Sequence, residues 1–238
     1  MVDPQTVVKE LGVLRNAFNV AIKEWEWCKE NPVSRVSMPK LPQVRVRYLS
    51  VEEISRLIEN ADEWFKAVLT CAVHTGMRQG NIVSLTWDKV DLFRREILLN
   101  KTKNEERQVL PINETLMKTL IQLNRVRLIG CELVFHVSGK PLYRKQIQRA
   151  LRKACKKVGI GDLRFHDLRH CFASLLIQSG EDLYTIQKLL GHKDGRMTQR
   201  YAHLTQGKLA SAVNNLHTVW QVSGIGKESA SGGLAVTA

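Results

Sequence analysis

The sequence predicts a mainly α domain with a small antiparallel β-sheet, an α+β fold class. Apolar residues recur at three- and four-residue steps over most of the chain, which is the period of an amphipathic helix. Between Asp91 and Ile112 the pattern changes to short runs of β-favouring residues. The chain has 238 residues and 44% hydrophobic content, enough for one sizeable core with a smaller appendage.

The chain begins with a predicted amphipathic helix over residues 4 to 27. Its apolar face consists of Val7, Val8, Leu11, Leu14, Phe18, Ile22 and Trp25, and one helix cannot bury such a face alone. A turn follows at Asn31 and Pro32, and residues 33 to 48, rich in proline and basic side chains, predict an extended linker. We therefore place a domain boundary between residues 43 and 44.

The second domain, residues 44 to 222, is expected to begin with a capped helix. Ser50 and Glu53 have the spacing of a capping box, in which each side chain accepts from the other residue's backbone N–H. Helices are predicted near residues 51–60, 63–75, 114–128, 144–158, 167–178, 182–190 and 197–202. The runs REILLN and RQVLPI flank residues 101–106 and predict a β-hairpin or a β-meander. Residues 223–238 have almost no core-forming side chains and predict a disordered tail.

Charge and cysteine content narrow the class of protein. Lys and Arg total 36 against 23 acidic residues, and the net charge of +13 favours a polyanionic partner, either nucleic acid or an anionic membrane surface. No apolar run approaches the roughly 20 residues of a membrane span, and the N-terminus lacks a signal-peptide pattern, so we expect a cytoplasmic protein. The 5 cysteines form no close pair, which argues against zinc and against a disulfide framework.

The positive charge is concentrated in residues 140–169, which hold ten Lys or Arg and two Asp and so carry +8 of the net +13. A clustered basic face is typical of contact with a DNA backbone. The alternative is a solvated helix face with no partner.

Four short segments carry side chains suited to phosphate chemistry: HTGMR at residues 74–78, Lys103 in the predicted hairpin, HDLRH at residues 166–170, and LGH at residues 190–192 followed by Tyr201. Each alone has a structural interpretation, since an arginine after a glycine turn is more often a surface ion-pair partner. Together, the segments HTGMRQGNIVSLTWDKVDL, KTKNEERQVLPI, FHDLRHCFAS and LLGHKDGRMTQRYAHL closely resemble the motif set of tyrosine recombinases, the family of phage integrases. The resemblance covers residues 50–205.

This resemblance implies the fold of a tyrosine recombinase catalytic domain. It also implies that the scissile phosphate is surrounded by Arg78, Lys103, His166, Arg169 and His192, and is attacked by Tyr201. The helix before Pro32 resembles the last helix of the family's core-binding domain. Residues 1–43 are therefore expected to be a remnant of that domain plus the linker, in a truncated gene product or a fragment.

The chemistry of each residue type agrees with the implied roles. Two guanidinium groups, Arg78 and Arg169, can stabilise the charge that develops on the non-bridging oxygens of a pentavalent phosphate. A tyrosine hydroxyl has a pKa near 10 and must lose a proton to attack, and His166 is the implied base. Lys103 is the implied general acid for the leaving 5′-oxygen, with Lys101 as the alternative.

The remaining histidines and the cysteine of the motif segments are expected to have roles other than base, acid or nucleophile. His192 is expected to donate a hydrogen bond to the phosphate, with helix capping as the alternative. His74, His170 and His203 are assigned structural roles. Two positions depart from the family pattern: Asn81 stands where many relatives have an acidic residue, and Cys171 replaces a common threonine and is not interpreted as a second nucleophile.

The expected partner is double-stranded DNA, bound by a homotetramer on synapsed sites that is monomeric when free, with excision or architectural DNA-bending proteins as further partners. No metal, cofactor or membrane is required. Expected DNA contacts are Arg45 and Arg47 in the linker, Lys101 and Arg107 in the hairpin, and Arg144, Lys145, Arg149, Arg152, Lys153 and Lys156 in the basic helix.

The resemblance leaves three functions to be weighed. The first is a site-specific recombinase that works through a 3′-phosphotyrosine intermediate. The second is a type IB topoisomerase-like enzyme that nicks and rejoins one duplex by the same chemistry. The third is a non-catalytic DNA-binding prophage remnant, which the six filled active-site positions disfavour.

Overall fold

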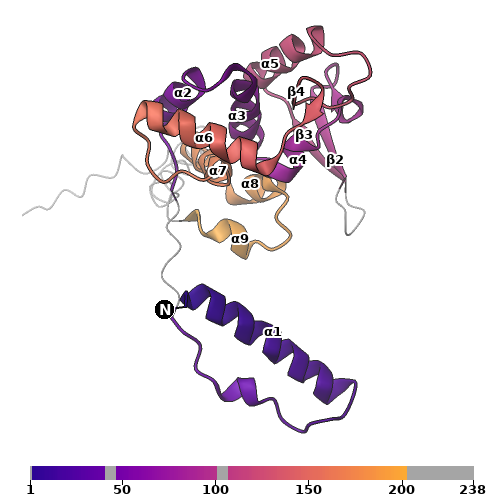
Figure 1. Ribbon diagram of the computed structural model, residues 1–238, viewed down its shortest axis with the longest axis vertical. Helices are drawn as coiled ribbons and strands as arrows, with labels where there is room; N and C mark the ends of the chain where they lie inside the picture. Colours follow the sequence, from indigo (N-terminus) through magenta and orange to yellow (C-terminus); the bar gives the residue numbers. More distant parts are fainter. Residues whose placement is uncertain (1, 41–46, 101–106, 203–238) are drawn as a thin grey trace, which may run out of the picture. The chain divides into compact units, whose positions relative to one another are not determined.

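The computed structural model describes residues 2–40, 47–100 and 107–202 (Figure 1). The chain forms two compact units that divide between residues 45 and 46. The domain boundary predicted between residues 43 and 44 falls in the segment 41–46, outside the described residues, as does the predicted tail 223–238.

The first unit consists of helix α1 (Pro4–Lys23) and the short 3-10 helix η1 (Pro32–Arg35). The α1 helix ends earlier than the predicted residue 27, because Glu26 has a positive φ of 53°, which is incompatible with a continuing α-helix. The rings of Trp25 and Trp27 lie against each other instead, with centroids 4.6 Å apart. No residue of α1 is buried, so within this unit its apolar face is only partly covered.

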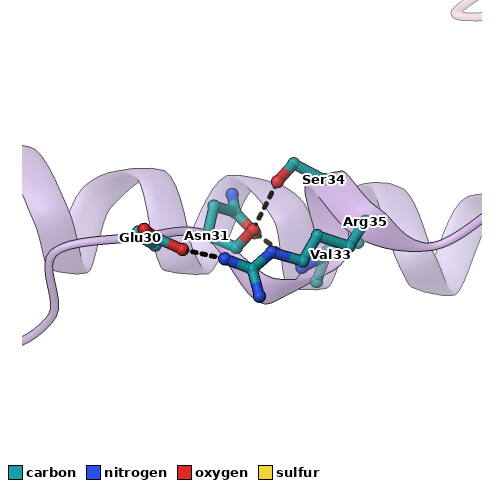
Figure 2. Close-up of polar contacts among 5 residues, drawn as sticks. All are labelled: Glu30, Asn31, Val33, Ser34 and Arg35. Carbon is teal, nitrogen blue, oxygen red and sulfur yellow. Dashed lines mark hydrogen bonds and ion pairs between the residues drawn. The ribbon is translucent and has the colours of Figure 1, made fainter.

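Asn31 starts η1 and ties it back to α1. Its side chain accepts a hydrogen bond from the N–H of Val33 (3.0 Å), and the hydroxyl of Ser34 donates to its carbonyl (2.6 Å), as Figure 2 shows. Its amide nitrogen donates to the carbonyl of Arg15 (2.9 Å) and to the side chain of Asn19 (2.8 Å), both on α1. The predicted turn at Asn31 and Pro32 is therefore a capped helical turn.

The second unit is mainly helical. Its α-helices are α2 (Val51–Glu59), α3 (Glu63–Thr75), α4 (Gln79–Val83), α5 (Glu114–Arg125), α6 (Arg144–Val158), α7 (Asp167–Gln178), α8 (Leu183–Leu190) and α9 (Arg196–Gln199), with a 3-10 helix η2 (Trp87–Lys89). The capping box predicted at Ser50 and Glu53 is present in full. The prediction missed α4, because five residues are too short to display a helical period.

A three-stranded antiparallel sheet interrupts the helices, with strands β1 (Val90–Asp91), β2 (Glu96–Asn100) and β3 (Arg107–Pro111) in that order. Pairing of β2 with β3 confirms the predicted hairpin. A second pair, β4 (His136–Val137) with β5 (Lys140–Pro141), was not predicted. In Figure 1 the larger sheet lies to one side of α2, α3 and α6. The predicted mainly α fold class with a small antiparallel sheet is confirmed.

Helix α3 forms the centre of the core. Phe65, Val68 and Leu69 are fully buried, and α3 packs against both α5 and α7. Helix α7 is buried over most of its length, and its buried polar residues are Arg169, His170 and Ser174. The core thus places the polar face of α7 beside the end of α3. Among the described residues, no helix is long and apolar enough to cross a lipid bilayer.

Candidate active site

Arg169 on α7 joins two glycine turns from distant parts of the chain. Its Nη1 donates to the carbonyl of Gly76 (2.6 Å), after α3, and its Nη2 donates to the carbonyl of Leu190, at the end of α8. The guanidinium therefore supplies donors to carbonyls that a helix end leaves without a partner. These bonds bring the segments HTGMR, HDLRH and LGH together.

Both turns require glycine. Gly76 and Gly191 each have a φ of 61°, in the left-handed region that ends many helices. A Cβ atom at Gly76 would lie 2.4 Å from Cδ1 of Phe172, and one at Gly191 would lie 2.4 Å from Oε1 of Gln108. Glycine thus allows α7 and β3 to approach the helix ends closely.

Arg169 is a buried cation that has no carboxylate in an ion pair with it among the described residues. Burial and, to a smaller extent, the nearby charge of Arg78 lower its pKa to about 10. The group stays protonated at neutral pH. A buried positive charge without a negative partner favours an anionic ligand.

Arg78 and His166 lie at the rim of the site. Arg78 precedes α4 and lines, with His166 and Arg144, a cavity of about 520 Å³. The pKa of His166 is lowered by the removal of water from around its ring, and further by the positive charges of Arg169 and Arg78. The imidazole is therefore neutral at pH 7 and faces an open space.

Tyr201 is buried, with 1% of its surface exposed, and its hydroxyl lies 2.5 Å from Nδ1 of His170. Burial raises the pKa of Tyr201 to about 12, against the opposing charges of Arg200 and Arg169. Burial lowers the pKa of His170 to about 4, with His166 as the next cause. In the tautomer that carries its proton on Nε2, the neutral imidazole of His170 accepts a hydrogen bond from the tyrosine hydroxyl at Nδ1.

His170, for which a structural role was predicted from the sequence, contacts Tyr201. Its ring lies edge-to-face on that of His166, with centroids 5.2 Å apart. The signal that could have revealed it is the spacing of HDLRH, since residues four apart lie on one face of a helix. His166 and His170 therefore face the same side.

His192 follows the turn at Gly191, and its Nδ1 lies 2.8 Å from the hydroxyl of Thr198, which is buried. Burial, followed by the positive charges of Arg169 and Arg78, lowers the pKa of His192 to about 4. In the tautomer in which Nδ1 accepts from Thr198, the neutral ring carries its proton on Nε2. That N–H is available as a donor to an oxygen ligand.

Five of the six implied catalytic residues lie within the described part of the chain: Arg78, His166, Arg169, His192 and Tyr201. His170 on α7 contacts both His166 and Tyr201, and Arg169 binds the turns that precede Arg78 and His192. Lys103 and its alternative Lys101 fall in residues 101–106, outside the described residues. Cys171 is buried and its Sγ accepts from the N–H of Leu49 (3.2 Å), and burial raises the pKa of the thiol to about 11, which disfavours the reactive thiolate.

The predicted DNA contacts on α6 lie on different sides of the helix. Arg144, Arg152 and Lys156 line a cavity of about 660 Å³ together with Gln148 and His166. We call Arg144, Arg152 and Lys156 the cavity edge of α6.

On the opposite side, Lys153 donates to the carboxylate of Asp62 (2.7 Å) and Lys157 donates to the carbonyl of Asn60 (2.9 Å). We call Lys153 and Lys157 the far edge of α6. The sequence could not separate the two edges, because the partners of the far edge come from the α2–α3 turn, about ninety residues away in the chain.

The remaining predicted DNA contacts lie on neither of these two edges or outside the described residues. Lys145 and Arg149 are exposed on α6, and Arg47 donates to the carbonyl of Gly161. Arg45 and Lys101 lie outside the described residues, and only the backbone of Arg107 is described.

Comparison with known proteins identifies the family. The sequence profile of the phage integrase family matches residues 47–208. The integrase of Salmonella phage P22 is 29% identical over 229 residues, which cover 92% of this chain and 59% of that protein. A shufflon-specific DNA recombinase of Escherichia coli is 32% identical over 213 residues, which cover 88% of this chain and 53% of that protein. The chain thus spans between half and two thirds of the length of these relatives.

A solved structure agrees with the sequence relatives. A lambda integrase dimer bound to a COC′ core site matches with a TM-score of 0.63 and 25% identity, over 80% of this chain and 57% of that chain. The matched profile contains the glycine turns, α7 and Tyr201, which are the segments that Arg169 and His170 hold together. The chain therefore belongs to the phage integrase family of tyrosine recombinases.

Proposed function

We propose that this chain carries the catalytic centre of a site-specific DNA recombinase that cleaves and rejoins strands through Tyr201. The observation that carries the proposal is the convergence of a tyrosine hydroxyl, neutral imidazoles and the unpaired buried cation Arg169 around α7. Arg78 and Arg169 stabilise the phosphate oxygens as negative charge develops on them, and the N–H of His192 donates to the same group.

The reaction is a transesterification. The Tyr201 oxygen forms a bond to phosphorus, the bond from phosphorus to the 5′-oxygen breaks, and a 3′-phosphotyrosine results. The hydroxyl proton goes to a neutral imidazole, and the leaving oxygen takes a proton from a general acid, for which Lys103 is proposed and Lys101 is the alternative. The ester retains the energy of the broken bond, so rejoining needs no nucleotide cofactor.

The DNA duplex is proposed to lie along the cavity edge of α6. Arg144, Arg152 and Lys156 border the same cavity as His166, so a backbone in this cavity is continuous with the proposed position of the scissile phosphate. Among the described residues, no carboxylate neutralises these three cations. Lys153, by contrast, already has Asp62 as its partner.

The relatives favour recombination over the two alternative functions. One relative is named an integrase and another a shufflon-specific DNA recombinase, and the lambda integrase structure contains a dimer bound to a core site. By analogy, protomers of the protein that contains this chain are proposed to assemble as a homotetramer on two synapsed sites, with the free protein monomeric and architectural DNA-bending proteins as helpers. A topoisomerase-like enzyme would act on one duplex and would not pair two sites.

The test is covalent trapping on a pool of nicked duplexes with randomised half-sites, because the nick lets the freed strand diffuse away and prevents rejoining. The wild type should become attached to DNA 3′-ends in the presence of EDTA, and sequencing of the trapped DNA should yield one site. Tyr201→Phe should give no adduct. Tyr184→Phe is the matched control, since Tyr184 is exposed on α8. An adduct with Tyr201→Phe, or none with the wild type, would refute the proposal.

A further inference from the structure

We propose that His170, rather than His166, takes the proton of the Tyr201 hydroxyl during strand cleavage. The inference rests on the proposed function and assigns the base within it. Nδ1 of His170 lies 2.5 Å from the hydroxyl oxygen, and both side chains are buried. Among the described residues, no other hydrogen bond of that hydroxyl is found.

The two histidines of HDLRH occupy different environments. His166 has no hydrogen bond to Tyr201 among the described residues, and it lines both cavities that border Arg144. Its ring reaches the ring of His170 by an edge-to-face contact. His166 is thus placed to contact the substrate, and His170 is placed between His166 and the nucleophile.

Burial and the charges around His170 keep its ring neutral in the resting site. Its neighbours are His166, Arg169 and Arg200, which disfavour a second positive charge, and Asp167, which favours one. In the resting site the balance leaves the ring neutral. When the phosphate gains negative charge in the transition state, that new charge stabilises the imidazolium that forms beside it.

The proton balance is complete in both directions. In cleavage, the O–H bond of Tyr201 breaks and an N–H bond forms at Nδ1 of His170, while the 5′-oxygen takes its proton from the general acid. In rejoining, the 5′-hydroxyl returns its proton to the general acid as its oxygen bonds to phosphorus. The bond from phosphorus to the tyrosine oxygen breaks, and that oxygen recovers its proton from Nδ1 of His170. His170 therefore ends each cycle neutral, as it began.

The experiment compares His170→Asn with His166→Asn. The side-chain oxygen of asparagine can occupy the place of Nδ1 and accept the same hydrogen bond, but it cannot take a proton. The single-turnover rate of covalent adduct formation is measured from pH 6.5 to 8.5 on a nicked duplex carrying the site recovered from the pool. DNA affinity and melting temperature are measured for each variant, to show that the fold and the hydrogen bond are retained.

Loss of the base has a distinct signature. His170→Asn should slow adduct formation by about 10² to 10⁴-fold at pH 7, the range for a lost general base. Its rate should then rise about tenfold per pH unit, because only the small phenolate fraction reacts. The wild type and His166→Asn should show no such rise. Single-turnover cleavage by His170→Asn at a near wild-type rate with a flat pH profile would overturn the inference, as would the steep profile appearing in His166→Asn.

Faster cleavage by His170→Asn would also overturn the inference, because it would mean that the hydrogen bond restrains Tyr201. The outcome is separable from failure of the proposed function. If the wild type forms no adduct, the proposed function fails. If the wild type forms one and the His170 variant behaves like it, only the assignment of the base fails.

Discussion

The site has a buried part, the floor, with Arg169 and His170, and an open part, the rim, with Arg78 and His166. Both contain an arginine and a histidine, but these side chains make different contacts in the two parts. On the floor, Arg169 and His170 are buried and each is already hydrogen-bonded to protein atoms. At the rim, no side-chain hydrogen bond is found for Arg78 or His166 among the described residues, and both line a cavity. The floor therefore holds the backbone and the nucleophile in place, while the rim keeps its donors available for a ligand.

This difference separates stability from chemistry. A floor residue stabilises the fold through the groups it satisfies, and it also acts on the reacting atoms. A rim residue acts on the ligand alone. Substitutions made in pairs, one residue from the floor and one from the rim, therefore test whether the two regions differ in this way.

The largest effect is expected from Arg169→Lys compared with Arg78→Lys. Each change removes a planar donor pair and should slow adduct formation by about 10² to 10³-fold. Only Arg169→Lys should destabilise the fold, by about 1–3 kcal/mol, because it leaves a buried carbonyl at Gly76 or Leu190 without its donor. Urea unfolding of both variants measures the change in the free energy of unfolding. Equal losses in the two variants would contradict the proposed difference between floor and rim.

A smaller effect is expected from the two edges of α6. Replacing Arg144 and Arg152 together by Ala should flatten the slope of log K against log salt by up to about 2, because each phosphate contact contributes about 0.9. Replacing Lys153 and Lys157 should change the slope little, since these side chains bind Asp62 and Asn60. Salt titrations of DNA binding by the two double variants, which remove the same formal charge, provide the measurement. A larger change from the far edge would place DNA on the opposite side of the helix.

The smallest effect is a dependence of stability on pH. The native pKa values of His170 and His192, about 4, lie below the value near 6.5 of an unfolded histidine. Between these values the unfolded chain binds protons that the native chain does not. The free energy of unfolding should therefore fall as pH drops from about 6.5 toward 4, and this stabilisation should be fully present above about pH 6.5.

For His170 the slope should be on the order of 1 kcal/mol per pH unit, and it should be smaller for His192, which is partly exposed to screening water. Urea unfolding at pH 7, 6 and 5 measures the slope of the free energy of unfolding against pH. His170→Asn should lose less stability than the wild type over this range. Parallel loss in both proteins would show that His170 is not held neutral by the fold.

Local signals in the sequence predicted most of the fold. The capping box at Ser50 and Glu53, the helical period of residues 144–158 and the β-favouring runs around residues 101–106 each act within a few residues, so they are legible without tertiary structure. The short helix α4 and the two-residue strands β4 and β5 were missed, because elements of that length depend on packing rather than on a period.

The site was predictable as a set of residue types and not as a set of contacts. The segment HDLRH predicts a helix with catalytic side chains. Which of its histidines contacts Tyr201 depends on the position of α9, which lies more than thirty residues later in the chain. Likewise, the charge of residues 140–169 does not reveal that Asp62 binds Lys153. Such pairings arise from tertiary packing, so the sequence alone left them open.

The central claim is that Tyr201 is the nucleophile of a DNA strand transferase, and the most direct measurement is to identify the residue that carries the DNA. The trapped adduct is digested with nuclease and protease, and the modified peptide is sequenced by mass spectrometry. The account predicts a nucleotide attached through its 3′-phosphate to Tyr201, in the peptide that follows Arg200. A nucleotide on Tyr184, on Cys171 or on a serine would contradict it.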